Sequence, residues 1–394
     1  MAQHEIVIVA AKRTPIGSML GSLSSLSAPE LGAISHQAVL EQSGIQPEQI
    51  DEVISGCVLQ AGIGQAPARQ AAILANIPDK AGATTINKMC GSGMKAVMLA
   101  HDLIQAGSAQ IILAGGMESM SNAPYLMQKA RSGYRLGHGE LKDHIFLDGL
   151  EDAYERGKLM GCFAEDTAQH YQFTREQQDD FATRSQQRAL QAQATHAFDH
   201  EIAPVTIATR QGDITIQQDE SPDKAKLDKI KQLRPVFKSD GTVTAANSSS
   251  IADGAASLIL MTAQQAKELG LRPLARLVAH ASHAQAPAWF TTAPIEAIRK
   301  VLHKTTWQLQ DVDAFEINEA FAVVTMAAIS SLELNPEIVN IHGGACALGH
   351  PIGASGARII VTLLYTLQQL QRSKGIAALC IGGGEATAVA IEML

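Results

Sequence analysis

Two cysteines in glycine-rich surroundings are the strongest candidates for chemistry. Cys90 stands in "NKMCGSGM" (87–94), and Cys380 opens "CIGGG" (380–384). A cysteine thiolate is a strong nucleophile, and glycines let another molecule approach backbone N–H groups that can hold an oxyanion. A free cysteine is also often a small buried apolar residue, so neither position alone decides between catalysis and packing.

A histidine and an asparagine extend this set. His350 lies in "GGACALGHPIGASGAR" (343–358), and Asn318 lies in "EINEAFA" (316–322). A histidine beside a thiol is the usual means of activating it, whereas an asparagine after a strand is more often a turn residue. Two thiols, one imidazole and backbone N–H groups can hold an acyl group as a thioester while the second thiol acts on a carbon acid. The set predicts carbon–carbon bond chemistry on thioesters without a metal.

A helix must follow Cys90. From Met94 onward apolar residues recur at spacings of three and four, which predicts an amphipathic helix over roughly 92–106. Cys90 then lies at the N-terminus, where unpaired N–H groups favour an anion, so we expect its thiol pKa to fall below the usual ~8.5. Short β-branched runs, the first at Ile6 to Ala10, alternate with helical patterns and indicate an α/β protein.

The chain repeats its own pattern. "QIDEVISG", "CGSGMK" and "IILAGGMES" in the first half correspond to "DVDAFEIN", "IGASGAR" and "ALCIGGGEA" in the second. Asp51 precedes Ser92 by 41 residues and Asp313 precedes Ser355 by 42, and a second helix is expected to start near Ser355. This order predicts an internal duplication whose strand ends and helix N-termini face one cleft.

A different pattern separates the two halves. Residues 121–250 are polar and include a Gln-rich helix (175–194) and a lysine-bearing stretch (221–238). We interpret this segment as an insertion, so that the domains are 1–120 plus 251–271, the inserted 121–250, and 272–394. The lysines favour either a surface for phosphate groups or simply a solvated helix face.

Composition narrows the partners. A net charge of −8 without long charged blocks argues against nucleic acid, and no apolar run is long enough to span a bilayer. Five scattered cysteines without a C-x-x-C pair, and no visible targeting signal, fit the cytoplasm. "GIGQAP" (62–67) carries Pro67 where a dinucleotide fingerprint needs glycine, and no phosphate loop occurs, so NAD and ATP are not supported.

Over essentially its whole length the sequence resembles the thiolases, and among them the biosynthetic type. The matching motifs are "VIVAAKRTPIG", "NKMCGSG", "AGGMESMS", "GTVTAANSSSIADGAA", "FEINEAFA", "GGACALGHPIGASGAR" and "CIGGG". The resemblance implies an α/β fold of duplicated βαβαβαββ halves in five αβαβα layers, with two similar five-stranded mixed sheets and an inserted loop domain. It also implies reversible condensation of two acetyl-CoA to acetoacetyl-CoA and CoA. Cleavage of longer or branched 3-ketoacyl-CoA is the alternative within the family, and a catalytically silent acyl-binding protein is the alternative outside it.

The resemblance assigns roles to particular residues. Cys90 resembles the nucleophile that takes the acetyl group, and His350 the base that activates it and then helps hold the thioester oxygen with a water positioned by Asn318. Cys380 resembles the second acid and base, which moves a proton on the acetyl methyl group. The backbone N–H groups of Cys90 and Gly382 would form the other oxyanion hole.

The substrate is implied in the same way. Coenzyme A and acetyl-CoA are expected as substrates, with no permanently bound cofactor and no metal. The residues expected along the CoA and acyl path are Leu233, Phe237, Ala245, Ser249, Lys224 and Phe321. A homotetramer formed through residues 121–145 is expected.

Four positions depart from the biosynthetic pattern. Leu159 replaces a histidine, Phe290 and Thr291 replace a Met-Gly pair, and Glu385 replaces a methionine. None of these is a proposed catalytic residue, but together they leave the preferred acyl chain open.

Overall fold

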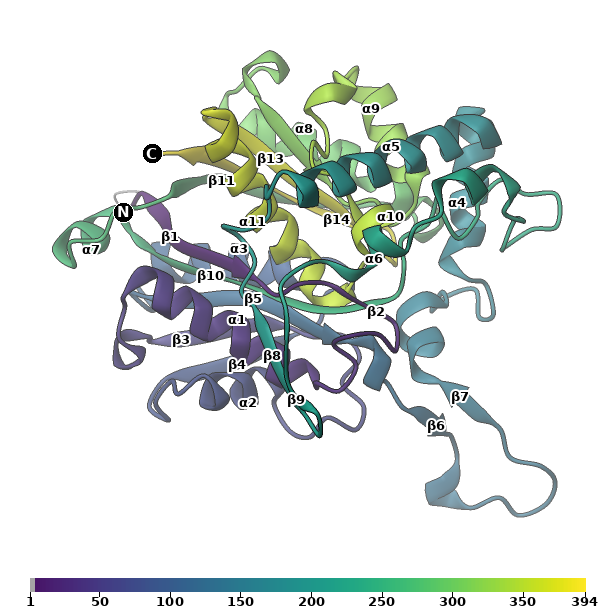
Figure 1. Ribbon diagram of the computed structural model, residues 1–394, viewed down its shortest axis with the longest axis horizontal. Coiled ribbons are helices and arrows are strands. Elements are labelled where there is room, and N and C mark those ends of the chain that lie inside the picture. The colour runs from purple at the N-terminus through teal and green to yellow at the C-terminus, as the bar shows by residue number, and fades with distance from the viewer. Residues whose placement is uncertain (1–3) are drawn as a thin grey trace.

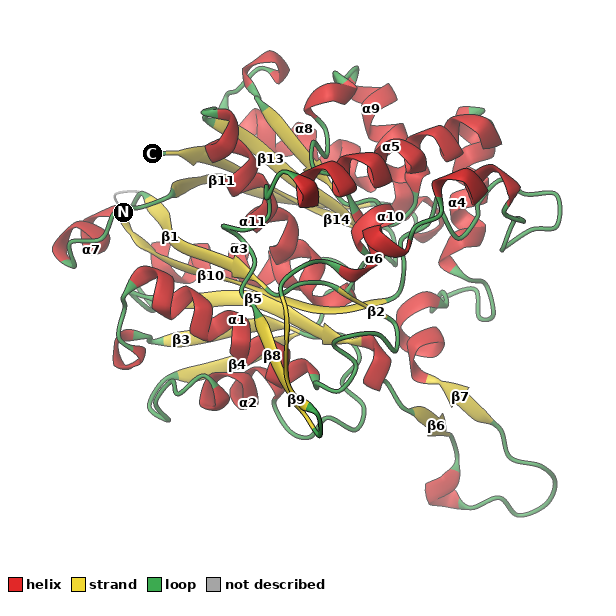
Figure 2. Ribbon diagram, viewed as in Figure 1, coloured by secondary structure: helices red, strands yellow, loops and turns green. Residues whose placement is uncertain are grey.

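The computed structural model describes residues 4–394 as an α/β protein with helices on both outer sides and between the two halves of its main sheet (Figures 1 and 2). The strands form one ten-stranded sheet in the order β12-β13-β14-β11-β1-β10-β5-β3-β4, with β2 beside β10. The first-half strands are β1 (Ile6–Arg13), β2 (Gly17–Ser18), β3 (Glu52–Gly56), β4 (Gly82–Ile86), β5 (Ile112–Ser119) and β10 (Ala252–Thr262). The second-half strands are β11 (Ala275–Ala284), β12 (Ala314–Ile317), β13 (Lys374–Ile381) and β14 (Glu385–Met393).

The two halves of the sheet are joined by a narrow seam. Strand β1 pairs antiparallel with β11 through only two residue pairs, Val7 with Arg276 and Ile8 with Ala275. The second half has four strands rather than the five expected from the family. The counterpart of β4 is reduced to a single bridge between Phe315 and Val339, because a short 3₁₀ segment occupies that position.

Helices cover the sheet in the expected five layers. Helices α1 (Ala28–Ser43) and α2 (Pro67–Leu74) pack on the outer face of the first half. Helices α8 (Ala293–Thr305) and α9 (Ala322–Leu332) pack on the outer face of the second. Between the halves lie α3 (Ser92–Gln105) and α11 (Ile352–Leu370), which share one core with strands of both sheets.

The two central helices approach unusually closely. A Cβ on Gly93 would lie 2.8 Å from the backbone nitrogen of Ala357, and a Cβ on Gly356 would lie 2.4 Å from the backbone nitrogen of Met94. Glycine is therefore required at both equivalent positions, since backbone atoms cannot move aside. Helix α11 begins at Ile352, slightly before the predicted start near Ser355, whereas α3 matches the prediction within a residue.

Two aspartates confirm the duplication in atomic detail. The Asp51 carboxylate accepts hydrogen bonds from the N–H groups of Gln110 and Ile111, just before β5. The Asp313 carboxylate accepts the same pair from Ser373 and Lys374 at the start of β13. Each half thus ties its own glycine-ended strand to its own aspartate in the same way.

The segment between β5 and β10 is an excursion between two neighbouring strands, because β10 returns to pair with β5. It contains β6 (Tyr125–Met127) and β7 (Leu141–Asp143), which project away from the body (Figure 1), and the ribbon β8 (Val205–Thr209) and β9 (Gly212–Ile216). It also contains α4 (Met160–Tyr171), α5 (Arg175–Ala194) and α6 (Glu220–Lys224). Helix α5 starts at the predicted residue, because Thr174 and Gln177 form a capping box there. Helix α7 (Ala263–Glu268) and α10 (Ala345–Leu348) complete the helices described here.

Candidate active site

Cys90 lies on a tight turn at the start of α3. The Ser92 hydroxyl donates to the Met89 carbonyl at 2.6 Å and accepts from the Lys88 N–H at 2.8 Å, and Met89 has a φ of 48°. A Cβ on Gly91 would lie 2.4 Å from Cδ1 of Ile381 in the other half. The glycine after Cys90 therefore allows β13 to approach the nucleophile loop.

The second cysteine ends this neighbouring strand. Cys380 is fully buried on β13, and the backbone N–H of Gly382 donates a hydrogen bond to the Cys90 sulfur. The two thiols also interact electrostatically, since Cys90 contributes to raising the pKa of Cys380. The structure thus places Cys90, Cys380 and Gly382 in one region.

The prediction that the free Cys90 thiol is acidic is wrong. Burial raises its pKa to about 11, and the charge of Glu118 acts in the same direction. The hydrogen bond from Gly382 lowers the pKa but does not outweigh burial. Helix position alone could not show this, because the turn that carries Cys90 also packs against Ile381 of the other half.

His350 is held in one tautomer. Its Nδ1 lies 2.6 Å from the Ser355 hydroxyl, and that hydroxyl donates its own proton to the Pro351 carbonyl at 2.9 Å. Ser355 must therefore accept from Nδ1–H, which leaves a lone pair on Nε2. Nε2 is buried and has no hydrogen-bond partner within residues 4–394, and burial together with the charge of Arg358 lowers the pKa of His350 to about 3. A neutral imidazole with a free Nε2 can accept a proton.

Asn318 is oriented by the same arginine. Its N–H donates to Ala378 on β13 at 3.0 Å, and Nη2 of Arg358 donates to its side-chain oxygen at 3.4 Å. The amide nitrogen of Asn318 is consequently left buried, with no hydrogen-bond partner among the residues that the structure describes. An unpaired buried donor costs about 1–3 kcal/mol, so this atom is suited to bind a water or a substrate group.

Glu118 is a residue of this region that the sequence reasoning did not single out. Its carboxylate accepts hydrogen bonds from the N–H groups of Val58, Leu59 and Gly353 at 2.8–3.1 Å. It thereby joins a loop of the first half to the start of α11. Burial raises its pKa to about 7, against the effect of the three N–H donors. Its place in the "AGGMESMS" motif was the available signal.

Phenylalanines close the space beside Cys380. The buried cluster that contains Cys380 also contains Phe163, Phe290 and Phe321, with Phe237 packed against it. The rings of Phe163 and Phe290 meet edge to face with centroids 6.2 Å apart, and those of Phe237 and Phe321 do so at 6.1 Å. The departure at Phe290 therefore lies next to the proposed second acid and base.

The other departures are also accounted for by contacts. Thr291 shares a 2.5 Å hydrogen bond with Thr167 of α4. Glu385 forms an ion pair with Lys88, two residues before the nucleophile, across the two halves. Leu159 caps α4 through its backbone and offers no polar side chain there.

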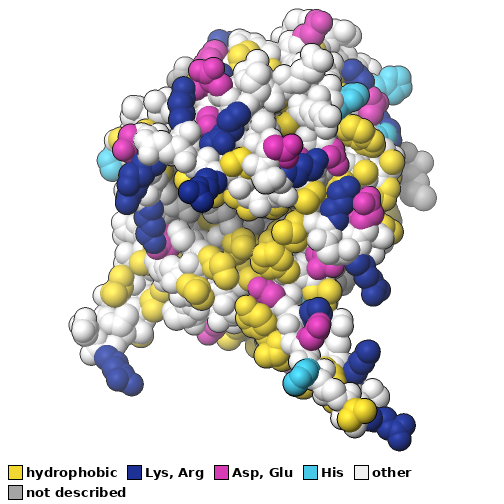
Figure 3. All heavy atoms as spheres, turned by 90° about the vertical axis from the view of Figure 1, so that its right-hand side faces the viewer, with side chains coloured by type: hydrophobic (Ala, Val, Ile, Leu, Met, Phe, Trp, Pro, Cys, Tyr) yellow, Lys and Arg dark blue, Asp and Glu magenta, His cyan; other side chains and the backbone are white. Residues whose placement is uncertain are grey.

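A cleft of about 410 Å³ contains three of the residues expected to meet CoA, namely Lys224, Leu233 and Ala245. Its wall also includes Lys226 and Lys229, whereas the ammonium of Lys224 is paired with Glu220. Ser249 lies beside it, with its N–H bonded to the Ala320 carbonyl at 3.0 Å. On this side of the molecule Lys and Arg side chains gather beside a hollow lined with hydrophobic side chains (Figure 3).

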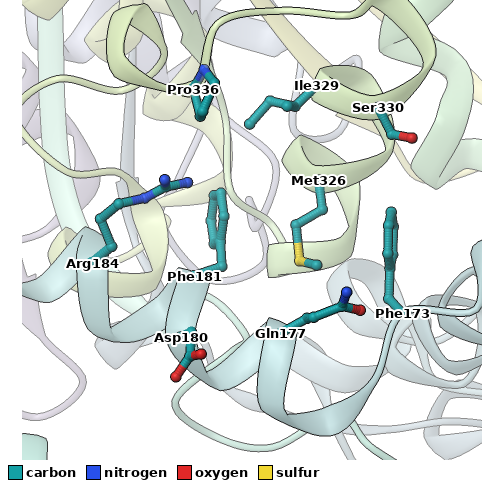
Figure 4. A pocket seen from close by; sticks show the side chains of 9 residues that line it. All are labelled: Phe173, Gln177, Asp180, Phe181, Arg184, Met326, Ile329, Ser330 and Pro336. Atoms are coloured by element: carbon teal, nitrogen blue, oxygen red, sulfur yellow. The ribbon is translucent and has the colours of Figure 1, made fainter.

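A second cleft, of about 520 Å³, lies between α5 and α9 and includes none of the predicted site residues. Phe173, Phe181 and Met326 point into it (Figure 4). We assign it no part in the chemistry.

The chain belongs to the thiolase family. The family model described as "Thiolase, N-terminal domain" matches residues 6–264, and the model described as "Thiolase, C-terminal domain" matches residues 271–393. The family and fold predicted from the sequence are thus confirmed.

Several named proteins are similar over their full length. An acetyl-CoA acetyltransferase of Cupriavidus necator is 48% identical over 390 residues, which cover 98% of this chain and 99% of that protein. The crystal structure of the Bacillus anthracis acetyl-CoA acetyltransferase matches with a TM-score of 0.97 and 42% identity, covering 100% of both chains. The Acat5 thiolase from Ascaris suum, solved in complex with coenzyme A, matches with a TM-score of 0.94 and 40% identity over 99% of this chain and 100% of that one.

No helix within residues 4–394 is long and apolar enough to cross a membrane.

Proposed function

We propose that the protein is an acetyl-CoA C-acetyltransferase, which reversibly condenses two acetyl-CoA to acetoacetyl-CoA and CoA. The relatives from Cupriavidus necator and Bacillus anthracis are named acetyl-CoA acetyltransferases, which supports the sequence-based prediction. The observation that carries the mechanism is the hydrogen bond that the Cys90 sulfur accepts from the N–H of Gly382, two residues beyond Cys380. In the cleavage direction a nucleophile, an oxyanion donor and a proton donor are all needed at one carbonyl, and this arrangement supplies the three.

The proton balance of cleavage follows from the neutral resting groups. The Cys90 sulfur attacks the 3-keto carbon, and its proton passes to Nε2 of His350. The carbon–carbon bond then breaks, and Cys380 gives its proton to the methylene carbon that becomes the methyl group of acetyl-CoA. In the second half, CoA loses its thiol proton to Cys380 and attacks the acetyl group on Cys90. The departing Cys90 sulfur recovers its proton from His350.

The pKa shift of Cys380 suits its two tasks. Burial raises the pKa of Cys380 well above its ordinary value, so the thiol is protonated when cleavage needs an acid. The same shift makes its thiolate a stronger base for removing a methyl proton in synthesis. The orphan amide nitrogen of Asn318 and the protonated Nε2 of His350 are assigned to the thioester oxygen, with a water between them.

The cleft lined by Lys226 and Lys229 is assigned to CoA. Leu233 and Ala245 would contact the nucleotide and pantetheine, and Phe237, Phe321 and Ser249 the path toward the thiols. Lys224 contributes less charge than expected, because Glu220 pairs with it. The phosphate groups of CoA therefore depend mainly on Lys226 and Lys229, which form no ion pair among the described residues.

We further propose a homotetramer assembled through residues 121–145. Apolar side chains are exposed along the projecting hairpin, with Leu136 99% exposed and Tyr125 66% exposed. Exposed apolar surface of this kind is typical of interaction sites. A monomeric mass in light scattering would contradict the proposal. The division into domains at 121, 251 and 272 stays a prediction, and the cytoplasm is proposed from five free cysteines.

The test is CoA-dependent cleavage of acetoacetyl-CoA beside 3-ketooctanoyl-CoA, followed by loss of the ketoacyl absorbance. Faster cleavage of the short substrate supports the proposal, and faster cleavage of the longer one would instead make the protein a degradative thiolase. Cys90→Ala should abolish cleavage. The matched control is Cys162→Ala, which removes a cysteine without a proposed catalytic role and should retain cleavage. Full activity of Cys90→Ala would refute the assignment of the nucleophile.

A further inference from the structure

A cluster of metal-ligating groups lies away from the thiols, at the seam between the two thiolase domains. His101 and Asp102 are on α3 of the N-terminal domain, and His280 is on β11 of the C-terminal domain. His280 of β11 lies within hydrogen-bonding distance of both His101 and Asp102 of α3. No sequence pattern indicated this cluster, because His280 lies 178 residues beyond Asp102 and the three residues form no spaced motif.

The three ligand atoms converge on one point. Nε2 of His280 lies 2.8 Å from Oδ1 of Asp102 and 3.3 Å from Nδ1 of His101, and the latter two atoms are 3.1 Å apart. Tetrahedral Zn²⁺ with bonds of about 2.0–2.1 Å separates its ligand atoms by roughly 3.3–3.4 Å. The histidine pair already has this separation, and the carboxylate oxygen requires a shift of a few tenths of an ångström by a side chain that is half exposed.

The surroundings leave the cluster accessible but well held. The side chains of His101 and His280 are 13% exposed, and their rings meet edge to face with centroids 4.9 Å apart. The ammonium of Lys304 is bound to the His280 backbone carbonyl at 2.8 Å, which fixes that cation on the backbone side of the residue. Nδ1 of His101 and Nε2 of His280 lie close to each other and to the carboxylate of Asp102, whose side chain is half exposed to solvent.

We propose that His101, Asp102 and His280 bind a divalent transition-metal ion such as Zn²⁺, with water as the fourth ligand. Two imidazoles and one carboxylate suit Zn²⁺, Co²⁺, Ni²⁺ and Cu²⁺ rather than Mg²⁺ or Ca²⁺, which prefer oxygen ligands. His101 lies eleven residues beyond Cys90, about 16 Å along the helix, so the ion takes no part in the reaction. Its effect is to join the two domains at a place where the sheet itself is joined by only two residue pairs.

Co²⁺ is the probe for this site, since its visible spectrum reports the ligands directly. We expect one Co²⁺ to bind with the visible bands of nitrogen and oxygen ligation and without the near-ultraviolet band of a thiolate ligand. Cys90 should be alkylated beforehand, so that the catalytic thiol cannot bind the ion. His101→Ala and His280→Ala should each weaken binding at least about tenfold, because each removes one of three protein ligands. His303→Ala, a histidine on neighbouring α8, is the matched control and should bind as the unaltered protein does.

A second measurement remains decisive if an alanine variant fails to fold. Zn²⁺ should raise the unfolding temperature of the unaltered protein, because an ion that binds only the native state stabilises it. The increase should be lost in Asp102→Asn and His280→Gln, and Mg²⁺ should produce none. The proposal would be overturned by absence of Co²⁺ binding or by ligation through a thiolate. It would also be overturned if His101→Ala and His280→Ala bound Co²⁺ as tightly as the unaltered protein does. The cluster would then be a hydrogen-bonded contact. None of these measurements depends on thiolase activity.

Discussion

Phe290 offers the sharpest test of how this active site selects its acyl chain. The side chain is 3% exposed and packs edge to face on Phe163 in the cluster that contains Cys380. Replacing it with alanine removes the ring beside the second thiol and opens space where the family resemblance places the acyl end. We expect the variant to accept a 3-ketoacyl chain longer than that of acetoacetyl-CoA.

The size of the effect follows from the methylene groups that the new space can bury. 3-Ketohexanoyl-CoA carries two more methylenes than acetoacetyl-CoA, and each buried methylene contributes about 0.8 kcal/mol. If both enter the space left by the ring, Phe290→Ala gains about 1.6 kcal/mol for the longer substrate relative to the shorter one. This corresponds to a rise of roughly 15-fold in the ratio of the two kcat/KM values.

The assay is thiolysis of both substrates by Phe290→Ala, with the ratio compared with that of the unaltered protein. Truncating a buried phenylalanine costs about 3–5 kcal/mol of stability, so Phe290→Leu provides a milder second variant. Phe315→Leu, a buried phenylalanine on β12 in a different cluster, controls for lost stability alone and should leave the ratio unchanged. An unchanged or lower ratio in a folded Phe290→Ala would refute the argument that this ring limits the pocket.

Three further predictions test the site and its supports. Cys380→Ser should still transfer acetyl from acetyl-CoA to Cys90 but lose condensation. Labelled acetyl on the trapped protein reports the first step. Loss of both steps would contradict the division of roles. Arg358→Met should lower kcat by about 10–100-fold with little change in KM, because the amide of Asn318 loses its fixed orientation. Arg358→Lys should recover part of the lost kcat. Equal losses in both variants, or a change confined to KM, would count against a positioning role. Burial lowers the pKa of His36 to about 3, so between pH 6.5 and that value only the unfolded chain binds this proton. The free energy of unfolding should therefore decrease as the pH is lowered below 6.5, by up to about 1.4 kcal/mol per pH unit. Urea unfolding between pH 6.5 and about pH 5 should show a shallower slope for His36→Asn, and an identical slope would exclude His36 as the source.

The features of this protein that its sequence predicts are those determined by residues close together along the chain. The periodic apolar residues after Met94 and the capping box at Thr174 place α3 and α5 within a residue, because both signals act within one helical turn. The paired roles of Asp51 and Asp313 follow from a repeat spacing that survives in the sequence. The motif resemblance then supplied the family.

The remainder depends on contacts between the halves. Burial raises the pKa of Cys90, at a turn that packs against Ile381 of the other half, and no local pattern records this contact. The orientation of Asn318 depends on Arg358, forty residues further along the chain. The missing fifth strand of the second half follows from the 3₁₀ segment at Pro336–Ile338, which single-sequence patterns do not separate from a short strand.

The two central helices have a consequence for how the protein is made. Helix α11 is buried along its whole course from Ile352 to Leu367, and α3 depends on it for the other side of its core. During synthesis α3 emerges roughly 250 residues before α11 is complete, an interval on the order of ten to fifty seconds at ribosomal speed. Throughout that interval the nascent first domain presents an apolar surface with no partner. We therefore expect it to require chaperone protection on the ribosome, and the first domain expressed alone to aggregate unless the second is produced beside it.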